Sequence, residues 1–78
     1  MDVIRGPQSN TRRQWTVKSG DREYRAVCYW CGGQLRMTWL VEVYVKVAQG
    51  TNYWRPIAGR DIINAVREYE NTLAHMSA

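Results

Sequence analysis

Histidine and cysteine are scarce in this chain, which leaves little material for metal, redox or acid–base chemistry. Among the 78 residues there are two cysteines, Cys28 and Cys31, and one histidine, His75. Nucleophilic catalysis needs a nucleophile with a base beside it, and no second candidate base stands in an obvious arrangement with His75. The glycines Gly32 and Gly33 are not followed by the helix that a phosphate-binding loop requires. We therefore expect a protein that is not an enzyme and has no cofactor.

The stretch CYWCGG, residues 28–33, carries both cysteines at a spacing that also occurs in zinc knuckles and redox motifs. A structural zinc takes about four ligands, whereas one chain offers this pair and a distant histidine. Alternation along a β-strand would also place Cys28 and Cys31 on opposite faces, where they can neither chelate one ion nor form a disulfide. We predict that Cys28 is a small core residue and that no metal is bound. The alternative is a dimer in which each chain supplies Cys28 and Cys31 to one zinc.

Long apolar runs are absent as well. The longest candidate, residues 35–47, is interrupted by Arg36, Glu42 and Lys46, so it does not qualify as a membrane span. The first ten residues contain no apolar segment of the kind that signal peptides have. We expect a soluble, cytoplasmic protein that does not associate with membranes.

Phenylalanine is missing and lysine is rare, and the residues that replace them favour contact surfaces. Nine of the eleven basic residues are arginines, and the chain has five tyrosines and four tryptophans. Arginine, tyrosine and tryptophan are enriched at protein interfaces, where lysine is depleted. The same residue types also contact phosphates and stack on bases. Together with a net charge of +4, this composition indicates a binding surface that favours an acidic partner.

The length of the chain suits one compact domain. Residues 1–11 contain a Gly-Pro and a Ser-Asn pair, both of which break regular structure. We predict a flexible N-terminal arm over these residues, although Val3 and Ile4 could pair at a sheet edge. Residues 12–78 are then a single domain made of a β-sheet and a helix.

Strand-like alternation is clearest in residues 35–47, with the sequence LRMTWLVEVYVKV. Apolar residues occupy every second position and mostly polar residues occupy the others, which is typical of a strand with one buried face. A tight turn centred on Gly32 and Gly33 would pair this strand with the preceding one. Cys28 would then lie opposite Met37, with apolar partners facing each other along the inner face.

The preceding hairpin is predicted from a second glycine turn. Gly20 and Asp21 would be its two central residues, because glycine suits the first central position of a type II′ turn. This turn places Trp15 opposite Ala26 on the inner face and gives that face a continuous apolar surface.

A third turn, at residues 49–50 (Gln-Gly), predicts a short fourth strand over residues 51–55. In this register Trp54 would lie opposite Val45 on the inner face. Pro56 would end the strand, because proline cannot donate a ladder hydrogen bond.

The periodicity changes in residues 59–76, with the sequence GRDIINAVREYENTLAHM. Apolar residues there recur at helical spacing: Ile62, Val66, Tyr69 and Leu73. We predict an α+β fold of two layers, in which an antiparallel meander of three or four strands carries one C-terminal amphipathic α-helix packed on one face.

A single helix covers only one face of the sheet, so the other face is the candidate binding site. In the predicted register it combines arginine and lysine with aromatic and aliphatic side chains. Glu23 and Glu42 are predicted to lie opposite each other there, where they would repel each other and a phosphate backbone. The candidate partner-binding residues are Arg25, Tyr29, Arg36, Leu40, Tyr44, Lys46, Tyr53 and Arg55.

Two kinds of partner fit such a face. We favour a protein partner, because an arginine- and tyrosine-rich surface with a few carboxylates matches protein interfaces. The chain would act stoichiometrically, as do the small anti-CRISPR and antirestriction inhibitors of phages and mobile elements, whose partners are nucleic-acid-handling complexes. The alternative is direct binding of DNA or RNA, with arginines on phosphates and tyrosines on bases. A homodimer also stays open, because the long strand leaves an edge to be covered.

Overall fold

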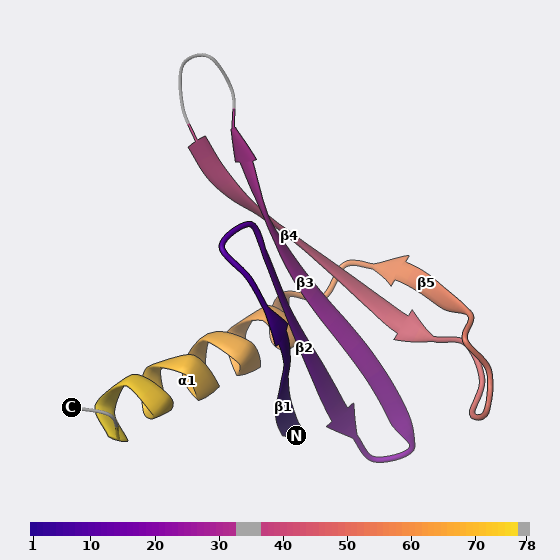
Figure 1. Ribbon diagram of the computed structural model, residues 1–78. Helices are drawn as coiled ribbons and strands as arrows, with labels where there is room; N and C mark the ends of the chain where they lie inside the picture. Colours follow the sequence, from indigo (N-terminus) through magenta and orange to yellow (C-terminus); the bar gives the residue numbers. More distant parts are fainter. Residues whose placement is uncertain (33–36, 77–78) are drawn as a thin grey trace.

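The described residues form one antiparallel sheet and one helix (Figure 1). The computed structural model describes residues 1–32 and 37–76, and of residues 31, 32 and 37–40 it describes the backbone alone. The elements are β1 (Asp2–Gln8), β2 (Arg12–Ser19), β3 (Arg22–Gly32), β4 (Met37–Lys46), β5 (Trp54–Ile57) and α1 (Arg60–Met76). The strands follow the order of the chain across the sheet. The predicted α+β meander is confirmed, with five strands where three or four were expected.

The additional strand is β1, which lies within the residues predicted as a flexible arm. It runs antiparallel to β2, with Val3 opposite Val17 and Ile4 opposite Thr16. This is the edge pairing that the sequence allowed for Val3 and Ile4. The prediction of an arm over residues 1–11 is corrected to that extent, because pairing with β2 gives the backbone of β1 hydrogen-bond partners within the protein.

The β2–β3 hairpin has the predicted register. Trp15 lies opposite Ala26, and Val17 lies opposite Tyr24. Gly20 has a φ of 61° at the first central position of the turn, where a type II′ turn requires a positive value. A residue with a side chain would be strained in that conformation, so this glycine determines how the two strands pair.

The β3–β4 register differs from the predicted one by four residues. Cys28 lies opposite Val41 instead of Met37, and Gly32 is still inside β3, opposite Met37. The predicted tight turn at Gly32 is therefore wrong, and the other glycine of that turn, Gly33, lies outside the described residues. Because the difference is an even number of residues, both strands keep their predicted faces.

The β4–β5 register differs from the predicted one by a single residue, and this exchanges the two faces of β5. Val45 pairs with Arg55, and Lys46 pairs with Trp54. Side chains alternate along a strand, so the difference moves Trp54 to the face away from α1 and Arg55 to the face toward it.

The connection before β5 is longer than the predicted two-residue turn. The backbone N–H of Val47 donates to the carbonyl oxygen of Tyr53 at 3.0 Å, so residues 48–52 form the loop. Pro56 was expected to end a strand over residues 51–55, and it lies inside β5 instead. Proline is tolerated there because β5 is an edge strand.

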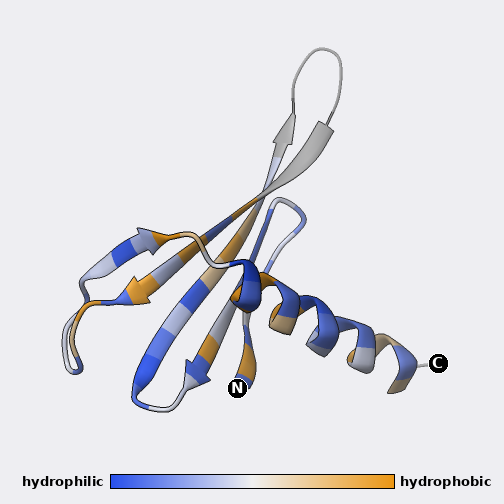
Figure 2. Cartoon of the chain, turned by 180° about the vertical axis from the view of Figure 1, so that it is seen from behind, coloured by the Kyte–Doolittle hydropathy of each residue, from blue (hydrophilic) through white to orange (hydrophobic). Residues whose placement is uncertain are grey.

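The hydrophobic core lies between α1 and the sheet. Ile62 and Val66, at two of the predicted helical positions, are buried, and Tyr69 packs against them. The buried strand residues of the same cluster are Trp15, Val17, Ala26, Cys28 and Val43. The helix crosses the sheet and extends past its edge at β1, with its hydrophobic residues in a stripe (Figure 2).

The start of α1 approaches the sheet closely at Gly59. A Cβ atom at this position would lie 2.7 Å from Cγ1 of Val43, which is shorter than a carbon–carbon contact allows. Glycine therefore lets the chain pass from β5 into the helix while staying in contact with β4. This determines where the helix begins to cover the sheet.

Candidate functional site

The face of the sheet away from α1, here called the outer face, is turned toward the reader in Figure 1. No described helix or strand covers it. Four predicted site residues lie together on this face, at alternate positions of β3 and β4: Arg25, Tyr29, Tyr44 and Lys46. The neighbouring positions are Arg12, Gln14, Thr16, Lys18, Glu23, Val27, Glu42, Trp54 and Pro56.

The ring of Trp54 lies at the centre of a cluster of charged side chains on one half of the outer face. The guanidinium carbon of Arg25 lies 4.2 Å from the centroid of its ring, and the ammonium of Lys46 lies 5.9 Å from a ring centroid of the same residue. Lys46 also forms an ion pair with Glu23 at 3.5 Å. An aromatic ring attracts cations electrostatically, more strongly where water is excluded. One cluster therefore links side chains of β3, β4 and β5.

Arg25 has one buried polar atom in this cluster, Nε. The atom is buried, and no hydrogen-bond acceptor for it lies among the described residues. A buried N–H without an acceptor costs free energy, on the order of 1–3 kcal/mol. The stacking of Arg25 on Trp54 is the contact that offsets part of this cost.

Two tyrosines dominate the other half of the outer face. The hydroxyl of Tyr44 donates a hydrogen bond to the carboxylate of Glu42. This hydrogen bond raises the pKa of Tyr44 above its ordinary value of 10.0, and burial and the negative charge of Glu42 add to the effect. Arg12 lies over the ring of Tyr29, with its guanidinium carbon 5.6 Å from the centroid.

Val27 lies in the middle of the outer face and is nevertheless only 1% exposed. Gln14 of β2 and Glu42 of β4 occupy the positions opposite it on either side. Since α1 packs on the other face, the side chains of the outer face themselves exclude water from Val27. The outer face is thus a packed layer, unlike a set of independently solvated side chains.

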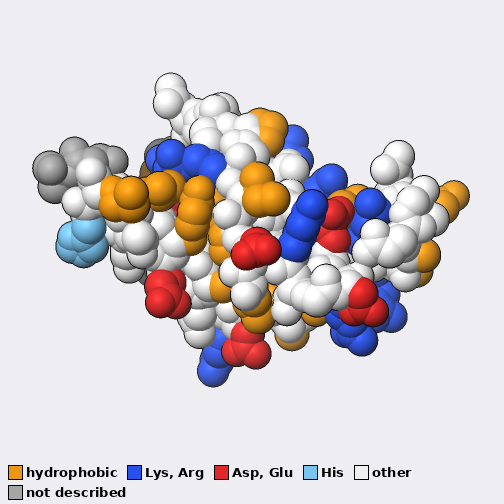
Figure 3. All heavy atoms as spheres, turned by 90° about the horizontal axis from the view of Figure 1, so that it is seen from below, with side chains coloured by type: hydrophobic (Ala, Val, Ile, Leu, Met, Phe, Trp, Pro, Cys, Tyr) orange, Lys and Arg blue, Asp and Glu red, His pale blue; other side chains and the backbone are white. Residues whose placement is uncertain are grey.

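Glu23 and Glu42 both lie on this face, but they do not lie opposite each other as the sequence predicted. Glu42 is opposite Val27 instead of Glu23, and Glu23 pairs with Lys46. The predicted repulsion between neighbouring carboxylates does not arise in this register. At the end of the sheet that holds the β2–β3 turn, basic and acidic side chains are interspersed with hydrophobic ones (Figure 3).

The other predicted site residues lie elsewhere. Arg55 is opposite Val45 on the helix side, as a consequence of the β5 register. Tyr53 precedes β5 and is 76% exposed. The backbone of Leu40 belongs to β4, but its side chain is outside the described part of the protein, and so is all of Arg36.

Trp54 is the residue of this face that sequence reasoning missed. A turn at residues 49–50 had placed it on the helix side. Ile57 carries the signal that would have corrected this, because it is the only aliphatic residue of the segment 51–57 and packs against the core. With Ile57 facing α1, alternation puts Trp54 on the outer face.

Cys28 is buried in the core, at 9% exposure. The strand positions of Cys28 and Cys31 lie on opposite faces of β3, because they are three positions apart, while the side chain of Cys31 is outside the described residues. Within residues 1–32 and 37–76, no group of three or more histidine, cysteine or acidic side chains is placed to hold a metal ion. Over the same described chain, no helix has the length and apolar character that crossing a membrane requires.

No protein-family model, no curated protein and no solved structure gives a significant match to this chain.

Proposed function

We propose that the protein is a cytoplasmic, non-catalytic binding protein that docks its outer face on a protein partner and acts by occupying the partner's surface. The observation that carries this proposal is the packed cation–aromatic layer of that face, with Arg25 on Trp54 and Arg12 on Tyr29. No described element covers the layer. Arginine, tyrosine and tryptophan are the residue types that most often anchor protein interfaces.

The order of the outer face supports binding. A long side chain that becomes immobile on association costs about 0.5–1.5 kcal/mol. Arg12 and Arg25 already rest on aromatic rings, and Lys46 is already paired with Glu23. Much of this side-chain entropy is therefore lost when the protein folds, and a partner would bind side chains that are already positioned.

The mixture of charges favours a protein over a phosphate backbone. Glu23 and Glu42 lie among the basic side chains, in contact with Lys46 and Tyr44 respectively. A nucleic acid laid across the face would bring phosphates against both carboxylates. A protein surface can instead offer a cation to each carboxylate and an acidic group to each arginine.

Stoichiometric occupation of a surface is also how small inhibitors work, and we extend the proposal to that role. The inhibitors that phages and mobile elements direct against CRISPR and restriction systems are of this type. The high content of arginine and aromatic residues in the chain supports this extension. The partner in that case would be a nucleic-acid-handling complex.

Affinity purification of the tagged full-length chain from its native cells, with and without nuclease, tests the proposal. We expect one protein to be retained at fixed stoichiometry after nuclease treatment. Tyr44→Ala and Trp54→Ala should each weaken the purified complex by about tenfold or more, as loss of an interface anchor does. Arg67→Ala is the matched control, because this exposed residue lies on α1, behind the sheet.

Equal affinities of both outer-face variants and the wild type would contradict the proposal, provided circular dichroism shows that the variants are folded. Loss of binding in Arg67→Ala alone would place the interface on the helix. If the retained protein is a second copy of this chain, sedimentation will show a dimer that the outer-face variants disrupt.

Direct binding of DNA or RNA is the second candidate, and the ion pair of Glu23 with Lys46 is the observation in its favour. One of the carboxylates that would repel phosphates is compensated by this pair. Affinity for nucleic acid would fall steeply with salt, at a slope that follows the number of phosphates neutralised. The absence of any shift of single- or double-stranded probes at low salt would remove this candidate.

A further inference from the structure

A pocket of about 410 Å³ lies at one end of the sheet, between the β2–β3 turn and the β4–β5 loop. Val45, which is half-buried, lies between Tyr24 of β3 and Arg55 of β5 in the strand register and is one of the lining residues. No described residue of α1 lines the pocket, so the helix leaves this part of its own side of the sheet open.

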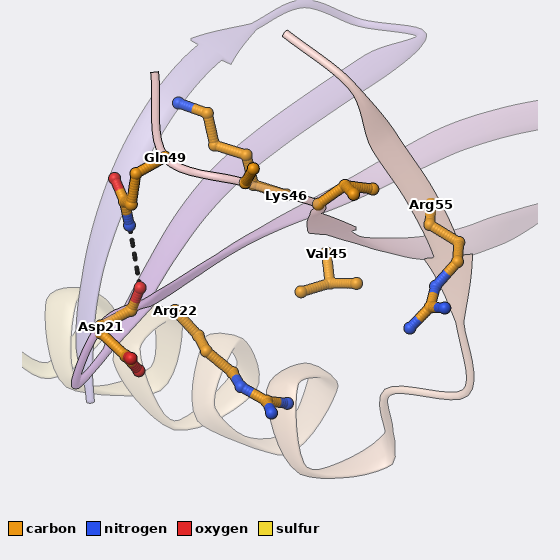
Figure 4. A pocket seen from close by; sticks show the side chains of 8 residues that line it. Asp21, Arg22, Val45, Lys46, Gln49 and Arg55 are labelled. Atoms are coloured by element: carbon orange, nitrogen blue, oxygen red, sulfur yellow. Dashed lines mark hydrogen bonds between the residues drawn. The ribbon is translucent and has the colours of Figure 1, made fainter. Parts of the chain in front are cut away.

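Two arginines enter the pocket from different strands. Arg22 extends from β3 and Arg55 from β5, and their guanidinium groups reach toward the same opening beside Val45 (Figure 4). The side-chain amide of Gln49 donates to the backbone carbonyl of Asp21 at 2.8 Å, which ties the β4–β5 loop to the β2–β3 turn. Residues of both connected loops therefore line the pocket.

The two arginines of the pocket have no acidic partner within the described part of the protein. Neither Arg22 nor Arg55 forms an ion pair there, whereas Arg5 pairs with Glu70 and Lys46 pairs with Glu23. Asp21 is the single acidic residue of the lining, whereas the guanidinium groups of Arg22 and Arg55 are both unpaired. The pocket thus keeps a net positive charge that an anion can neutralise.

We propose that this pocket binds a terminal phosphate group, either as inorganic phosphate or as the phosphate monoester of a small molecule. A carboxylate has two oxygens, which one guanidinium satisfies in a bidentate pair. A terminal phosphate has three oxygens and nearly two negative charges, and it can engage two guanidinium groups that approach from different strands. Val45 offers an apolar surface to the organic part of a monoester.

This site differs from the outer face in position and in chemistry. Arg22 and Arg55 reach the pocket from the helix side of the sheet, whereas Trp54 faces the other way and Lys46, which also lines the pocket, is paired with Glu23. The two proposals can therefore fail separately. A substitution of Arg22 or Arg55 is expected to leave the capture of a protein partner by the outer face unchanged.

The test is a nuclear magnetic resonance titration of the full-length, isotopically labelled protein, observing the arginine side-chain N–H groups and the amide of Val45. The probes are inorganic phosphate, phenyl phosphate, benzoate and a short oligonucleotide without terminal phosphates. We expect saturable shifts at Arg22, Arg55 and Val45 with inorganic phosphate, with a Kd of about 1 mM or tighter. Tighter binding of phenyl phosphate would identify a monoester as the preferred source, and weaker binding would identify inorganic phosphate.

Matched variants locate the site. Arg22→Gln and Arg55→Gln should each weaken the binding of phosphate by about tenfold, because each removes charge-assisted hydrogen bonds. Arg60→Gln removes the same charge from an exposed position at the start of α1 and should leave the affinity unchanged.

Several results would overturn the inference. They are shifts that never saturate, shifts of equal size at arginines outside the pocket, an equal loss of affinity in Arg60→Gln, and binding of benzoate or the oligonucleotide as tight as that of phosphate.

Discussion

Trp15 on β2 donates its indole N–H to the carboxylate of Glu70 on α1 at 2.5 Å. Arg5 on β1 donates to the same carboxylate through Nη2 at 2.6 Å and through Nε at 3.2 Å. A single half-buried side chain thus joins the helix to two strands, one of them at the edge of the sheet.

Replacing Glu70 should therefore loosen the contact between α1 and the sheet. Glu70→Ala removes the acceptor of both partners, and we expect it to lower the free energy of unfolding by about 1–2 kcal/mol. Glu70→Gln keeps an acceptor for Trp15 and should cost less. Chemical denaturation measures both values, with Glu68→Ala on the exposed side of the same helix as control. A loss in Glu68→Ala as large as in Glu70→Ala would show that the bridge contributes nothing specific.

The hydrogen bond between Tyr44 and Glu42 predicts a pH effect at the alkaline end. The raised pKa of Tyr44 means that the folded protein holds the phenolic proton more tightly than the unfolded chain does. Its contribution to stability is complete below about pH 10 and is lost as the pH rises through the raised pKa. An absorbance titration of phenolate, with Tyr44→Phe to assign the signal, should show Tyr44 ionising after an ordinary tyrosine.

Glu42→Gln is the companion variant for that titration. It removes the negative charge and the strong acceptor, so the pKa of Tyr44 should move back toward 10.0. No difference between Glu42→Gln and the wild type would contradict the assigned cause.

The burial of Val27 predicts that the packed side chains of the outer face contribute to the stability of the fold. Its exposure of 1% is close to the 0% of Val17, which lies beneath α1. We expect Val27→Ala and Val17→Ala to destabilise the fold by similar amounts, about 1–3 kcal/mol each. A solvated outer face would instead make Val27→Ala nearly neutral, which thermal and chemical unfolding can distinguish.

The close approach of Gly59 to Val43 predicts that a side chain added at position 59 would clash with Val43. The added methyl group of Gly59→Ala would lie 2.7 Å from Cγ1 of Val43, so we expect a loss of about 1–3 kcal/mol in unfolding free energy. A double-mutant cycle with Val43→Ala checks the cause, because the shorter side chain removes the clash. Gly59→Ala should cost clearly less in that background. Additive losses would point to the backbone of Gly59 as the origin.

The fold could be predicted from the sequence where local chemistry determines pairing. Gly20 requires a specific turn, so the register of β2 and β3 followed from one residue. The β3–β4 pairing was wrong because the alternating pattern is equally satisfied when a strand slides by two or four residues. Gly32 resembles a turn residue by type, yet it lies within β3.

The candidate site was predicted in part for the same reason. Arg25, Tyr29, Tyr44 and Lys46 share the outer face because an even error in register preserves faces. Trp54 and Arg55 exchanged faces because the β4–β5 error was odd. Contacts between side chains, such as Arg25 on Trp54, depend on three-dimensional packing that no periodicity encodes.

The bridge from Arg5 to Glu70 also has a consequence for how the chain folds during synthesis. These residues are 65 positions apart, and the first strand leaves the ribosome long before the helix. Adjacent hairpins join neighbours in sequence and can form as they emerge. The apolar surface around Trp15 and Val17 stays exposed until the helix segment has been synthesised. During this time nascent chains can associate through that surface. Packing of α1 on the sheet ends this exposure, and slow synthesis of the helix segment would prolong the interval in which copies can aggregate.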